Sequence, residues 1–372
     1  MKTVVTAALL SLLTVLPGHA QVAENNYQAE EVVTGLHYPW SIASLPEGGW
    51  LVTERSGGLK HVTAAGVVTA VAAEFPDLYV ESQAGLFELQ LTPDFDNTRA
   101  VVVSYACGTG DANNTCVVRG IIPEDRPYRL TDLQMIFTAQ PKKAGASHYG
   151  GRMTWLADGT LLIGLGDGFD YREQAQNLDN HLGTIVRIHA DGRVPDDNPY
   201  LHKQAPEIYS YGHRNVQGLV YDPVRDAVWQ HEHGPRGGDE LNKIIAGKNY
   251  GWPLVSYGID YSGARVTPFD DLPGLVSPLY HWTPSLAPAG LALYSGHALE
   301  GWHGDLLVAH LVGRRLQRFS QDASGEWQLT EELLNEYGAR LRAVHVGRDG
   351  AVYVLTDSDN AALLRITQKG TD

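Results

Sequence analysis

Residues 153–167, MTWLADGTLLIGLGD, carry the pattern that decides the fold, two apolar strands joined by a tight Asp-Gly turn. Five more segments of the 372-residue chain repeat it around acidic or glycine-containing turns. They are SIASLPEGGWLVTE at 41–54, LQLTPDFDNTRAVVVSY at 89–105, LVYDPVRDAVWQH at 219–231, LALYSGHALEGWHGDLLVAH at 291–310 and VHVGRDGAVYVLTD at 344–357. Long amphipathic helical patterns are almost absent, so the chain is predicted to be all-β.

The spacing of these hairpins favours a six-bladed β-propeller. They recur about every 60 residues, which exceeds the roughly 40–45 residues of a minimal four-stranded blade and leaves room for sizeable loops. We expect one propeller domain over residues 21–372, with each hairpin forming the inner part of a blade. A large β-sandwich, or two sandwiches, would also suit the strands but would not require six similar hairpins. Loops at one end of a propeller channel converge, so distant residues can share a site there.

The charge balance excludes one class of partner. Acidic residues outnumber basic ones by 43 to 28, and the net charge is -15. Binding to nucleic-acid phosphates needs a surplus of Lys and Arg, so no nucleic-acid partner is expected. A basic cluster in this protein must therefore serve a local purpose.

The N-terminus has the layout of a secretory signal peptide over residues 1–20. Lys2 precedes an apolar run at 4–16, and small residues follow up to Ala20, near which we expect cleavage. The run is too short to span a membrane, and no later apolar stretch is long enough. We therefore expect a periplasmic or secreted protein with no membrane span. In an oxidising compartment Cys107 and Cys116 could form a disulfide, although two unpaired thiols remain the alternative.

Three segments carry candidate catalytic or anion-binding side chains. His148, just before a glycine pair, could act as a general base, although a lone histidine is more often a structural hydrogen-bonding group. Residues 211–218, YGHRNVQG, place several donors between two glycines. Arg340 and Arg342 share one strand face, which suggests a carboxylate or phosphate ligand, or else a solvated basic face.

A fourth segment suggests a metal site. His231, Glu232 and His233 adjoin one another, but three neighbouring ligands on one strand rarely enclose a transition metal. The residues that follow, GPRGGDE at 234–240, are more informative, because a Gly-Pro turn can aim successive carbonyl oxygens at one point. Nearby carboxylates add the oxygen ligands that Ca²⁺ prefers. An ordinary acidic turn remains the alternative.

A series of motifs then runs in order along the chain. They are PW...LP.GG.LVTER at 39–55, QAGL at 83–86, TPDF at 92–95, HYGGR at 148–152, LDNHLGTIVRI..DGRVPDDNP at 178–199, YGHRNVQGL at 211–219, EHGPRGGDELN at 232–242, NYGWP at 249–253, HWTPSLAPAGL at 281–291 and RLR at 340–342. From about residue 36 to 366 the chain resembles the soluble quinoprotein aldose (glucose) sugar dehydrogenases. These are six-bladed propellers that carry pyrroloquinoline quinone (PQQ) and Ca²⁺, and sorbosone-dehydrogenase-like relatives share parts of the pattern.

The resemblance implies a PQQ- and calcium-dependent oxidation of an aldose at C1 to the lactone. His148 matches the general base, and Arg214 matches a group that stabilises charge on the quinone. The other implied cofactor contacts are Gln83, Asn215, Arg340 and Arg342. The Gly234 and Pro235 carbonyls match the Ca²⁺ ligands, and the implied substrate contacts are Gln83, Ser147 and Trp282.

Two departures from the family pattern bear on glucose preference and on cofactor affinity, in that order. Ser147 stands where the glucose enzymes' pattern has an acidic residue that contacts sugar. A cofactor-contacting lysine falls near Val312, with Arg314 or Arg315 the nearest substitute. The implied partners are an aldose and an external electron acceptor, and a monomer and a homodimer both remain open. The alternative functions are a non-catalytic saccharide- or protein-binding propeller that has lost the cofactor, and a calcium-dependent propeller lactonase.

Overall fold

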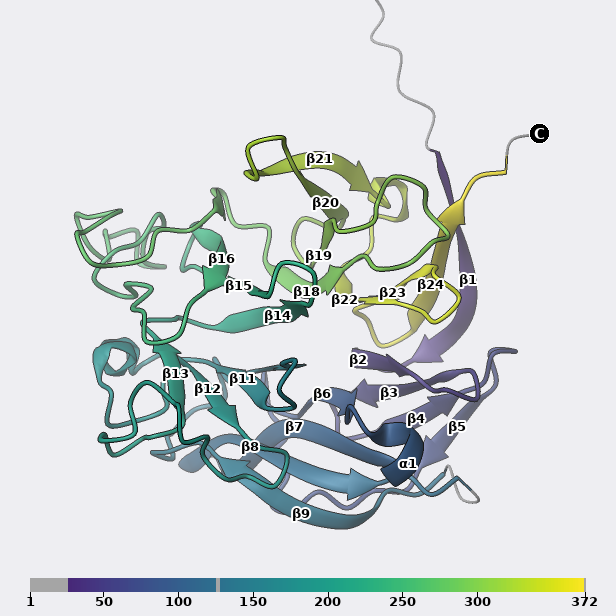
Figure 1. The fold of residues 1–372 in the computed structure, drawn as a ribbon, viewed down its shortest axis with the longest axis horizontal. Helices are drawn as coiled ribbons and strands as arrows, with labels where there is room; N and C mark the ends of the chain where they lie inside the picture. The colour runs from purple at the N-terminus through teal and green to yellow at the C-terminus, as the bar shows by residue number, and fades with distance from the viewer. Residues whose placement is uncertain (1–25, 125–127, 371–372) are drawn as a thin grey trace, which may run out of the picture.

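Six four-stranded antiparallel sheets form a ring around a central channel (Figure 1). This computed structural model describes residues 26–124 and 128–370. The predicted signal peptide at residues 1–20 lies outside the described residues. The predicted all-β, six-bladed propeller is confirmed, and the described helices are limited to α1 (Phe95–Thr98) and the 3₁₀ turns η1 (Arg172–Gln176) and η2 (Asn335–Tyr337).

The strands follow the chain blade by blade. Blade 1 contains β2 (Pro39–Ser44), β3 (Trp50–Glu54), β4 (Leu59–Val62) and β5 (Val68–Val71); blade 2 contains β6 (Leu86–Leu91), β7 (Ala100–Thr109), β8 (Ala112–Ile121) and β9 (Thr131–Thr138); blade 3 contains β10 (Gly150–Trp155), β11 (Leu161–Leu165), β12 (Thr184–Ile188) and β13 (Ile208–Tyr211). Blade 4 contains β14 (Val216–Asp222), β15 (Ala227–Glu232), β16 (Asp239–Ile244) and β17 (Tyr280–Trp282); blade 5 contains β18 (Pro288–Leu293), β19 (Leu306–His310), β20 (Leu316–Gln321) and β21 (Trp327–Leu333); blade 6 contains β22 (Leu341–Val346), β23 (Val352–Thr356), β24 (Ala361–Gln368) and β1 (Tyr27–Leu36).

Each hairpin predicted from the sequence forms the two inner strands of a blade. In blade 3 the turn between β10 and β11 contains Gly159, whose φ of 78° lies in the left-handed region that favours glycine. Asp158 accepts a hydrogen bond from the Thr160 backbone N–H at 2.9 Å and so closes this turn. The Asp-Gly signal in the sequence therefore had a local physical cause.

The two ends of the chain close the ring together. Strand β1 pairs antiparallel with β24, from Tyr27 opposite Gln368 to Leu36 opposite Ala361. The purple β1 and yellow β24 lie side by side in Figure 1. Blade 6 thus combines three strands from the C-terminal part of the chain with one from the N-terminal part, and closure removes an exposed sheet edge.

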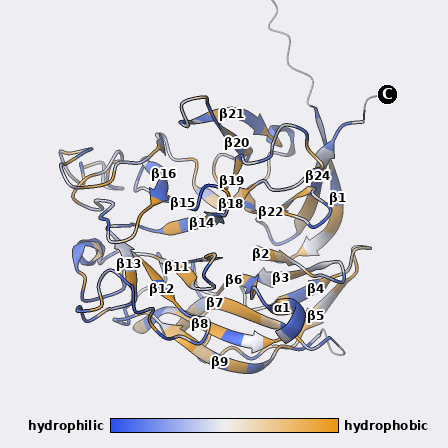
Figure 2. Cartoon of the chain, in the orientation of Figure 1, coloured by the Kyte–Doolittle hydropathy of each residue, from blue (hydrophilic) through white to orange (hydrophobic). Residues whose placement is uncertain are grey.

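The hydrophobic core lies between neighbouring blades. Strands β3, β11 and β19 are buried along their whole length, because both faces of each blade pack against an adjacent blade. Outer strands such as β21 alternate buried and exposed residues instead. Figure 2 shows apolar residues along the strands and polar residues in many of the connecting segments.

Arg152 on β10 joins the inner strands of all six blades. Its guanidinium lies 3.5 Å from the Glu88 carboxylate of β6 and 3.8 Å from the ring centre of Trp40 on β2. It also donates hydrogen bonds to the backbone carbonyls of Gln217 (2.8 Å), Ala289 (2.8 Å) and Arg342 (3.3 Å), one on each remaining inner strand. Burial lowers the pKa of Arg152 to about 10, so the side chain stays charged at neutral pH.

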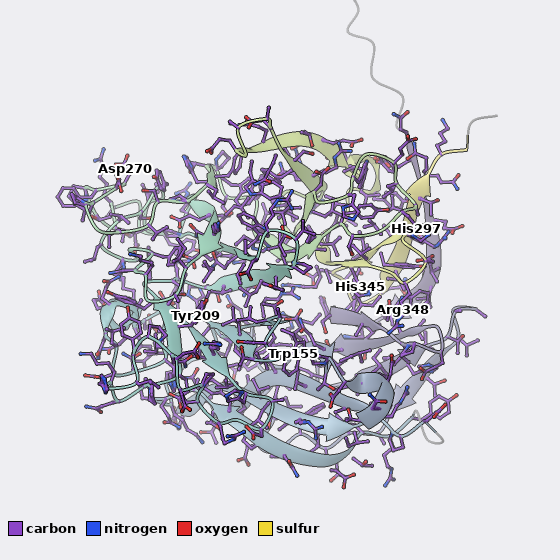
Figure 3. All side chains as sticks on the ribbon, viewed as in Figure 1. Trp155, Tyr209, Asp270, His297, His345 and Arg348 are labelled. Carbon is purple, nitrogen blue, oxygen red and sulfur yellow. A yellow bond between two sulfur atoms is a disulfide. The ribbon has the colours of Figure 1, made fainter. Side chains whose placement is uncertain are left out.

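Arg152 lies between two cavities of the channel. One cavity, of about 360 Å³, is formed by the C-terminal halves of the inner strands and includes Arg152 and Glu88. His345, which Figure 3 labels near the middle of the ring, also borders it. The other cavity, of about 190 Å³, lies at the N-terminal ends of the inner strands, and Gln217 and Arg342 line it.

Two further predictions concern the described residues. Cys107 on β7 and Cys116 on β8 are joined by a disulfide bond across their hairpin. In the described part of the chain, none of the helices has the length and apolar character needed to cross a membrane.

Candidate active site

The 190 Å³ cavity receives residues from every blade, because the segments leading into the inner strands converge there. Its polar lining consists mainly of Arg55, Gln83, Asn215, Gln217, Arg340 and Arg342. Four of these, Gln83, Asn215, Arg340 and Arg342, are residues that the sequence analysis assigned to a cofactor site. Residues from opposite ends of the described chain, Trp40 and Arg342, thus meet at one end of the channel.

His148 lies at the edge of this cavity, just before Tyr149 and Gly150, which line it. Its backbone has a φ of 52°, and its N–H donates to the Gln83 side-chain oxygen at 3.0 Å. A side chain at Gly166 would come within 2.1 Å of the His148 carbonyl, so glycine is required there. The turn that presents His148 is therefore held by both neighbouring strands and by Gln83.

A buried carboxylate orients the imidazole. Nδ1 of His148 lies 2.7 Å from Oδ1 of Asp167, and the two side chains are only 5% and 1% exposed. Asp167 also accepts hydrogen bonds from the Trp252 indole and from the Phe169 backbone N–H, each at 2.8 Å. The carboxylate is thus fixed by three donors, and it fixes the ring in turn.

Burial decides the protonation state of this pair. Burial lowers the pKa of His148, the hydrogen bond to Asp167 opposes that effect only in part, and the positive charge of Arg214 adds to it. Burial would raise the pKa of Asp167, but its contacts with His148 and Arg214 outweigh this and hold it below its ordinary value. At neutral pH the imidazole is therefore neutral and Nδ1–H donates to Asp167, which leaves Nε2 as the basic nitrogen.

Arg214 and Asn215 connect His148 to the Gly-Pro turn. Arg214 donates to the carbonyl of His233 at 3.1 Å and also to the carbonyl of Gly234, and it lies over the Trp252 ring. The Asn215 side-chain oxygen accepts from the Gly150 N–H at 3.2 Å. Arg214 therefore links the start of blade 4 to the Gly-Pro turn, and Asn215 links it to the glycine pair that follows His148.

The far side of the cavity carries a group of arginines with one carboxylate. Asp357 lies 2.9 Å from Nε of Arg340 and 3.5 Å from a terminal nitrogen of Arg342. Burial would raise the pKa of Asp357, but the charges of Arg342 and Arg340 hold it below its ordinary value. Arg55 also lines the cavity, so three guanidinium groups face a single acid there. This local surplus of positive charge suits a polyanionic ligand.

Two of the arginines predicted to contact a cofactor have a side-chain N–H donor without a hydrogen-bond partner among the residues that the structure describes. Within residues 26–124 and 128–370, Nε of Arg214 and Nε of Arg342 are buried atoms without a hydrogen-bond partner. A buried charged donor without a partner is costly unless something binds it. These orphaned donors therefore mark the place where a ligand's acceptor atoms would fit.

The Asp239 carboxylate holds the Gly-Pro turn in place through hydrogen bonds to protein groups. Asp239 accepts hydrogen bonds from the Gly234 N–H (3.0 Å), the Ser285 hydroxyl (2.6 Å) and the Leu286 and Ala287 N–H groups (3.1 Å each). Among the described residues no group of three His, Cys, Asp or Glu side chains is placed to hold a metal. A cation at this turn would therefore depend on backbone carbonyl oxygens, as the sequence analysis expected of Gly234 and Pro235.

The two histidines beside this turn serve separate structural contacts. The His233 Nε2–H donates to the Pro288 carbonyl at 2.7 Å. The His231 ring packs against Gly218, where a Cβ atom would come within 2.3 Å of the ring. Burial lowers the pKa of His233 to about 3, so this ring is neutral at physiological pH.

The structure places one predicted substrate residue elsewhere. Trp282 is 3% exposed and packs in the core between blades 4 and 5 with Leu241 and Phe319, while its indole donates to Gln317 at 2.8 Å. It does not line the cavity, because the alternation of β17 turns its side chain into the blade interface. Ser147 precedes His148 at the site and is half-buried.

The two arginines near Val312 also lie apart from the cavity. Arg314 donates to the Gly338 carbonyl at 3.1 Å, and Arg315 pairs with Glu332 at 2.7 Å. Both are occupied by partners on blade 5 or in the turn before blade 6. Neither lines the cavity, to which this segment contributes Leu311 instead.

Asp167 and Arg55 are not among the predicted site residues. Asp167 is the last residue of the hairpin segment at 153–167, and Arg55 is the last residue of the motif at 39–55. The sequence does carry a signal for both residues, because each is a charged residue that closely follows an apolar strand. Arg55 follows β3, and Asp167 follows β11. Side chains in that position cluster at one mouth of a propeller.

These features define a propeller with a histidine–carboxylate pair and an arginine-rich pocket at one mouth of its channel. The profile of the Glucose / Sorbosone dehydrogenase family matches residues 36–365, and the chain belongs to this family. It is 36% identical to aldose sugar dehydrogenase YliI of Escherichia coli over 342 residues, which cover 90% of this chain and 91% of that protein.

Solved structures show the same relationship. The apo form of the soluble aldose sugar dehydrogenase from Escherichia coli matches with a TM-score of 0.88 and 35% identity, over 92% of this chain and 100% of that one. The PQQ-bound aldose sugar dehydrogenase from Streptomyces coelicolor matches with a TM-score of 0.75 and 28% identity, over 91% of this chain and 98% of that one.

Proposed function

We propose that this protein is a PQQ- and calcium-dependent aldose dehydrogenase that oxidises the C1 hydroxyl of an aldose to the lactone and passes the electrons to an external acceptor. The observation that carries the proposal is the His148–Asp167 pair at the edge of an arginine-lined cavity. Family membership and the PQQ-bound relative from Streptomyces coelicolor support it.

The cavity has the chemistry that PQQ requires. PQQ carries three carboxylates, and Arg55, Arg340 and Arg342 line the cavity, where Asp357 pairs with Arg340 and Arg342. The unpartnered Nε atoms of Arg214 and Arg342 supply donors that such a ligand would satisfy. Gln83 and Asn215 complete the set of predicted contacts at the same cavity.

The Gly-Pro turn would hold Ca²⁺ through the carbonyl oxygens of Gly234 and Pro235. Backbone carbonyl oxygen is a ligand that Ca²⁺ accepts. The Gly234 carbonyl now accepts a hydrogen bond from Arg214, so the Arg214 side chain is the group that would have to share or yield this oxygen.

The chain's own residues would carry the proton. Nε2 of His148 would accept the proton of the C1 hydroxyl, while Asp167 holds Nδ1–H and stabilises the imidazolium that forms. Arg214 would stabilise negative charge that develops beside the cavity. When bound, PQQ would accept the C1 hydride as a two-electron acceptor, and Ca²⁺ would polarise the carbonyl that receives it.

We also propose that the protein works in the periplasm or outside the cell. Cleavage near Ala20 would release a single propeller domain, residues 21–372, into the periplasm or the medium. An oxidising compartment of that kind is consistent with the Cys107–Cys116 disulfide.

Reconstitution tests this proposal. The purified protein, stripped with a chelator, would be mixed with PQQ, Ca²⁺, a panel of aldoses and a dye acceptor. We expect dye reduction that needs both additions, and a loss of about 10²–10⁴-fold in His148→Ala with PQQ absorbance retained. No dye reduction by a correctly folded protein would overturn the proposal; tight PQQ binding without turnover would indicate a binding propeller, and lactone hydrolysis without PQQ a lactonase.

A further inference from the structure

Two exposed aromatic rings stand beside the proposed base. Phe169 is 44% exposed and Tyr261 is 60% exposed, and their rings stack at 6.2 Å with 28° between the planes. The Phe169 ring also meets the His148 ring edge-on at 5.0 Å. An aromatic surface that water can reach therefore begins at His148 and leads outward through two separate chain segments.

Hydrogen bonds constrain the backbone next to each ring. Phe169 has a φ of 72°, an unusual conformation for a bulky residue, and its N–H is tied to Asp167. Tyr261 lies in a tight turn in which Asp260 and Ala264 pair, and Ile259 pairs with Arg236 directly after the Gly-Pro turn. The backbone that carries the aromatic pair is thus joined to Asp167 on one side and to the residue after the Gly-Pro turn on the other.

A polar cleft of about 420 Å³ is formed by the two chain segments that carry these rings. It is lined by Arg172, Glu173, Asp260, Ser262 and Arg265. Arg172 and Asp260 form an ion pair at 3.3 Å across the cleft, with side chains 40% and 30% exposed. Asp260 and Ser262 flank Tyr261 in the sequence, and Arg172 follows Phe169 by three positions, so the segments that supply the rings also supply the charges.

This combination is suited to a pyranose ring. A sugar has apolar C–H faces that can cover an exposed aromatic ring, and hydroxyl groups that accept from guanidinium and donate to carboxylate. Interspersed charges of both signs do not suit a nucleic acid or a lipid surface, which select for basic groups. The cleft also lies apart from the arginine-lined cavity, since the two share no lining residue.

We propose that Phe169, Tyr261 and this polar cleft form an outer saccharide subsite. It would bind the second and later sugar units of an oligosaccharide whose reducing end lies at His148. The reducing-end placement rests on the proposed function, whereas binding of sugar units by the cleft does not. The segment between β16 and β17 carries Tyr261 and, farther along, Asp270, which Figure 3 shows at the margin of the molecule.

The first test compares substrates in the PQQ- and Ca²⁺-loaded protein. We expect the ratio of kcat/KM for maltotriose to that for glucose to fall about tenfold in Tyr261→Ala, because the sugar loses an apolar contact surface. Tyr261→Phe keeps the ring and should keep the ratio. The matched control is Tyr128→Ala, which removes another exposed tyrosine, 48% exposed, that contacts His61 on blade 1.

The second test is independent of catalysis. Maltotriose would be titrated into cofactor-free protein, with saturation-transfer NMR to identify the sugar protons that contact the protein. We expect transfer to the non-reducing units, lost in Tyr261→Ala and kept in Tyr128→Ala. An unchanged kcat/KM ratio in Tyr261→Ala, or no transfer in the parent protein, would overturn the subsite. If dye reduction fails with every sugar while transfer is lost in Tyr261→Ala, the proposed function fails and the subsite stands.

Discussion

At the scale of single residues, the chemistry depends on how Asp167 sets the state of His148. The imidazole is almost fully buried, and a hydrogen-bonded carboxylate orients its ring. Trp252 fixes that carboxylate in turn, and the same indole lies beneath Arg214. A short chain of contacts therefore controls both the base and the neighbouring cation.

Asp167→Asn should reduce kcat by about 10²–10⁴-fold, because an amide nitrogen can donate to Nδ1 and so favour the tautomer with Nε2–H. Activity should rise with pH as His148 loses its proton, at a pKa below the ordinary value of 6.5. Since Asp167 raises that pKa, the rise should move to lower pH in the variant. The measurement is kcat and kcat/KM against pH in reconstituted protein.

The control for this variant is Asp170→Asn, which neutralises a carboxylate three positions away that forms no hydrogen bond with the imidazole. It should leave the pH profile in place. Full activity and an unshifted profile in Asp167→Asn would show that the carboxylate does not act through His148.

A motif with its own local geometry indicates which side chains lie near one another, although the roles assigned to them stay predictions. The segment from Tyr211 to Gly218 contributes Asn215 and Gln217 to the 190 Å³ cavity, and His148 precedes Tyr149, which also lines it. The partner of His148 was missed because Asp167 belongs to a different strand, and only strand pairing reveals that contact. Trp282 failed for a related reason: the sequence shows a tryptophan near site motifs, but the pleat of β17 determines which way it points.

At the scale of elements, the inner hairpins were predictable because each combines apolar strands with a turn that has local chemistry. The outer strands were less predictable from sequence, because they depend on pairing with the strand beside them. Strand β5 is short, and β9 is partly polar. The pairing of β1 with β24 could not be read from either segment, because nothing local in β1 indicates a partner more than 300 positions away.

The β7–β8 hairpin offers a test at this scale. Its Cys107–Cys116 disulfide is buried between strands, and replacing both residues by Ala should lower the free energy of unfolding by about 2 kcal/mol. Thermal unfolding of the parent protein should shift downward with reductant, whereas the double variant should not respond. Two results together would contradict this prediction. The parent protein and the double variant would melt at the same temperature, and the parent, unfolded without reductant, would show two reactive thiols.

At the scale of the whole molecule, Arg152 replaces a hydrophobic centre with a single buried cation. It reaches the inner strands of five other blades, so it couples sheets that are not neighbours in the ring. Burial raises the pKa of Glu88, and the charge of Arg152 opposes that shift. The axis of the ring therefore depends on one ion pair and three backbone carbonyls.

Arg152→Met should lower the free energy of unfolding by about 3–5 kcal/mol, because it leaves Glu88 buried without its partner. Adding Glu88→Gln should recover part of the loss, since a neutral amide costs less to bury than a carboxylate. Urea unfolding followed by tryptophan fluorescence measures both.

Arg193→Met serves as the comparison, because the Arg193–Asp191 pair is exposed to solvent and should contribute no measurable stability. If Arg152→Met were as stable as Arg193→Met, the contacts along the axis would be incidental to the fold.

The pairing of β1 with β24 also orders events in time. Strand β1 is made early and its partner is among the last segments to be synthesised, so the sixth blade cannot be completed until the chain is nearly finished. Until then β1 presents an unpaired edge that other chains can join. A product that stops short of Ala361 would keep that edge permanently, and the expected outcome is association with a second copy rather than a smaller ring.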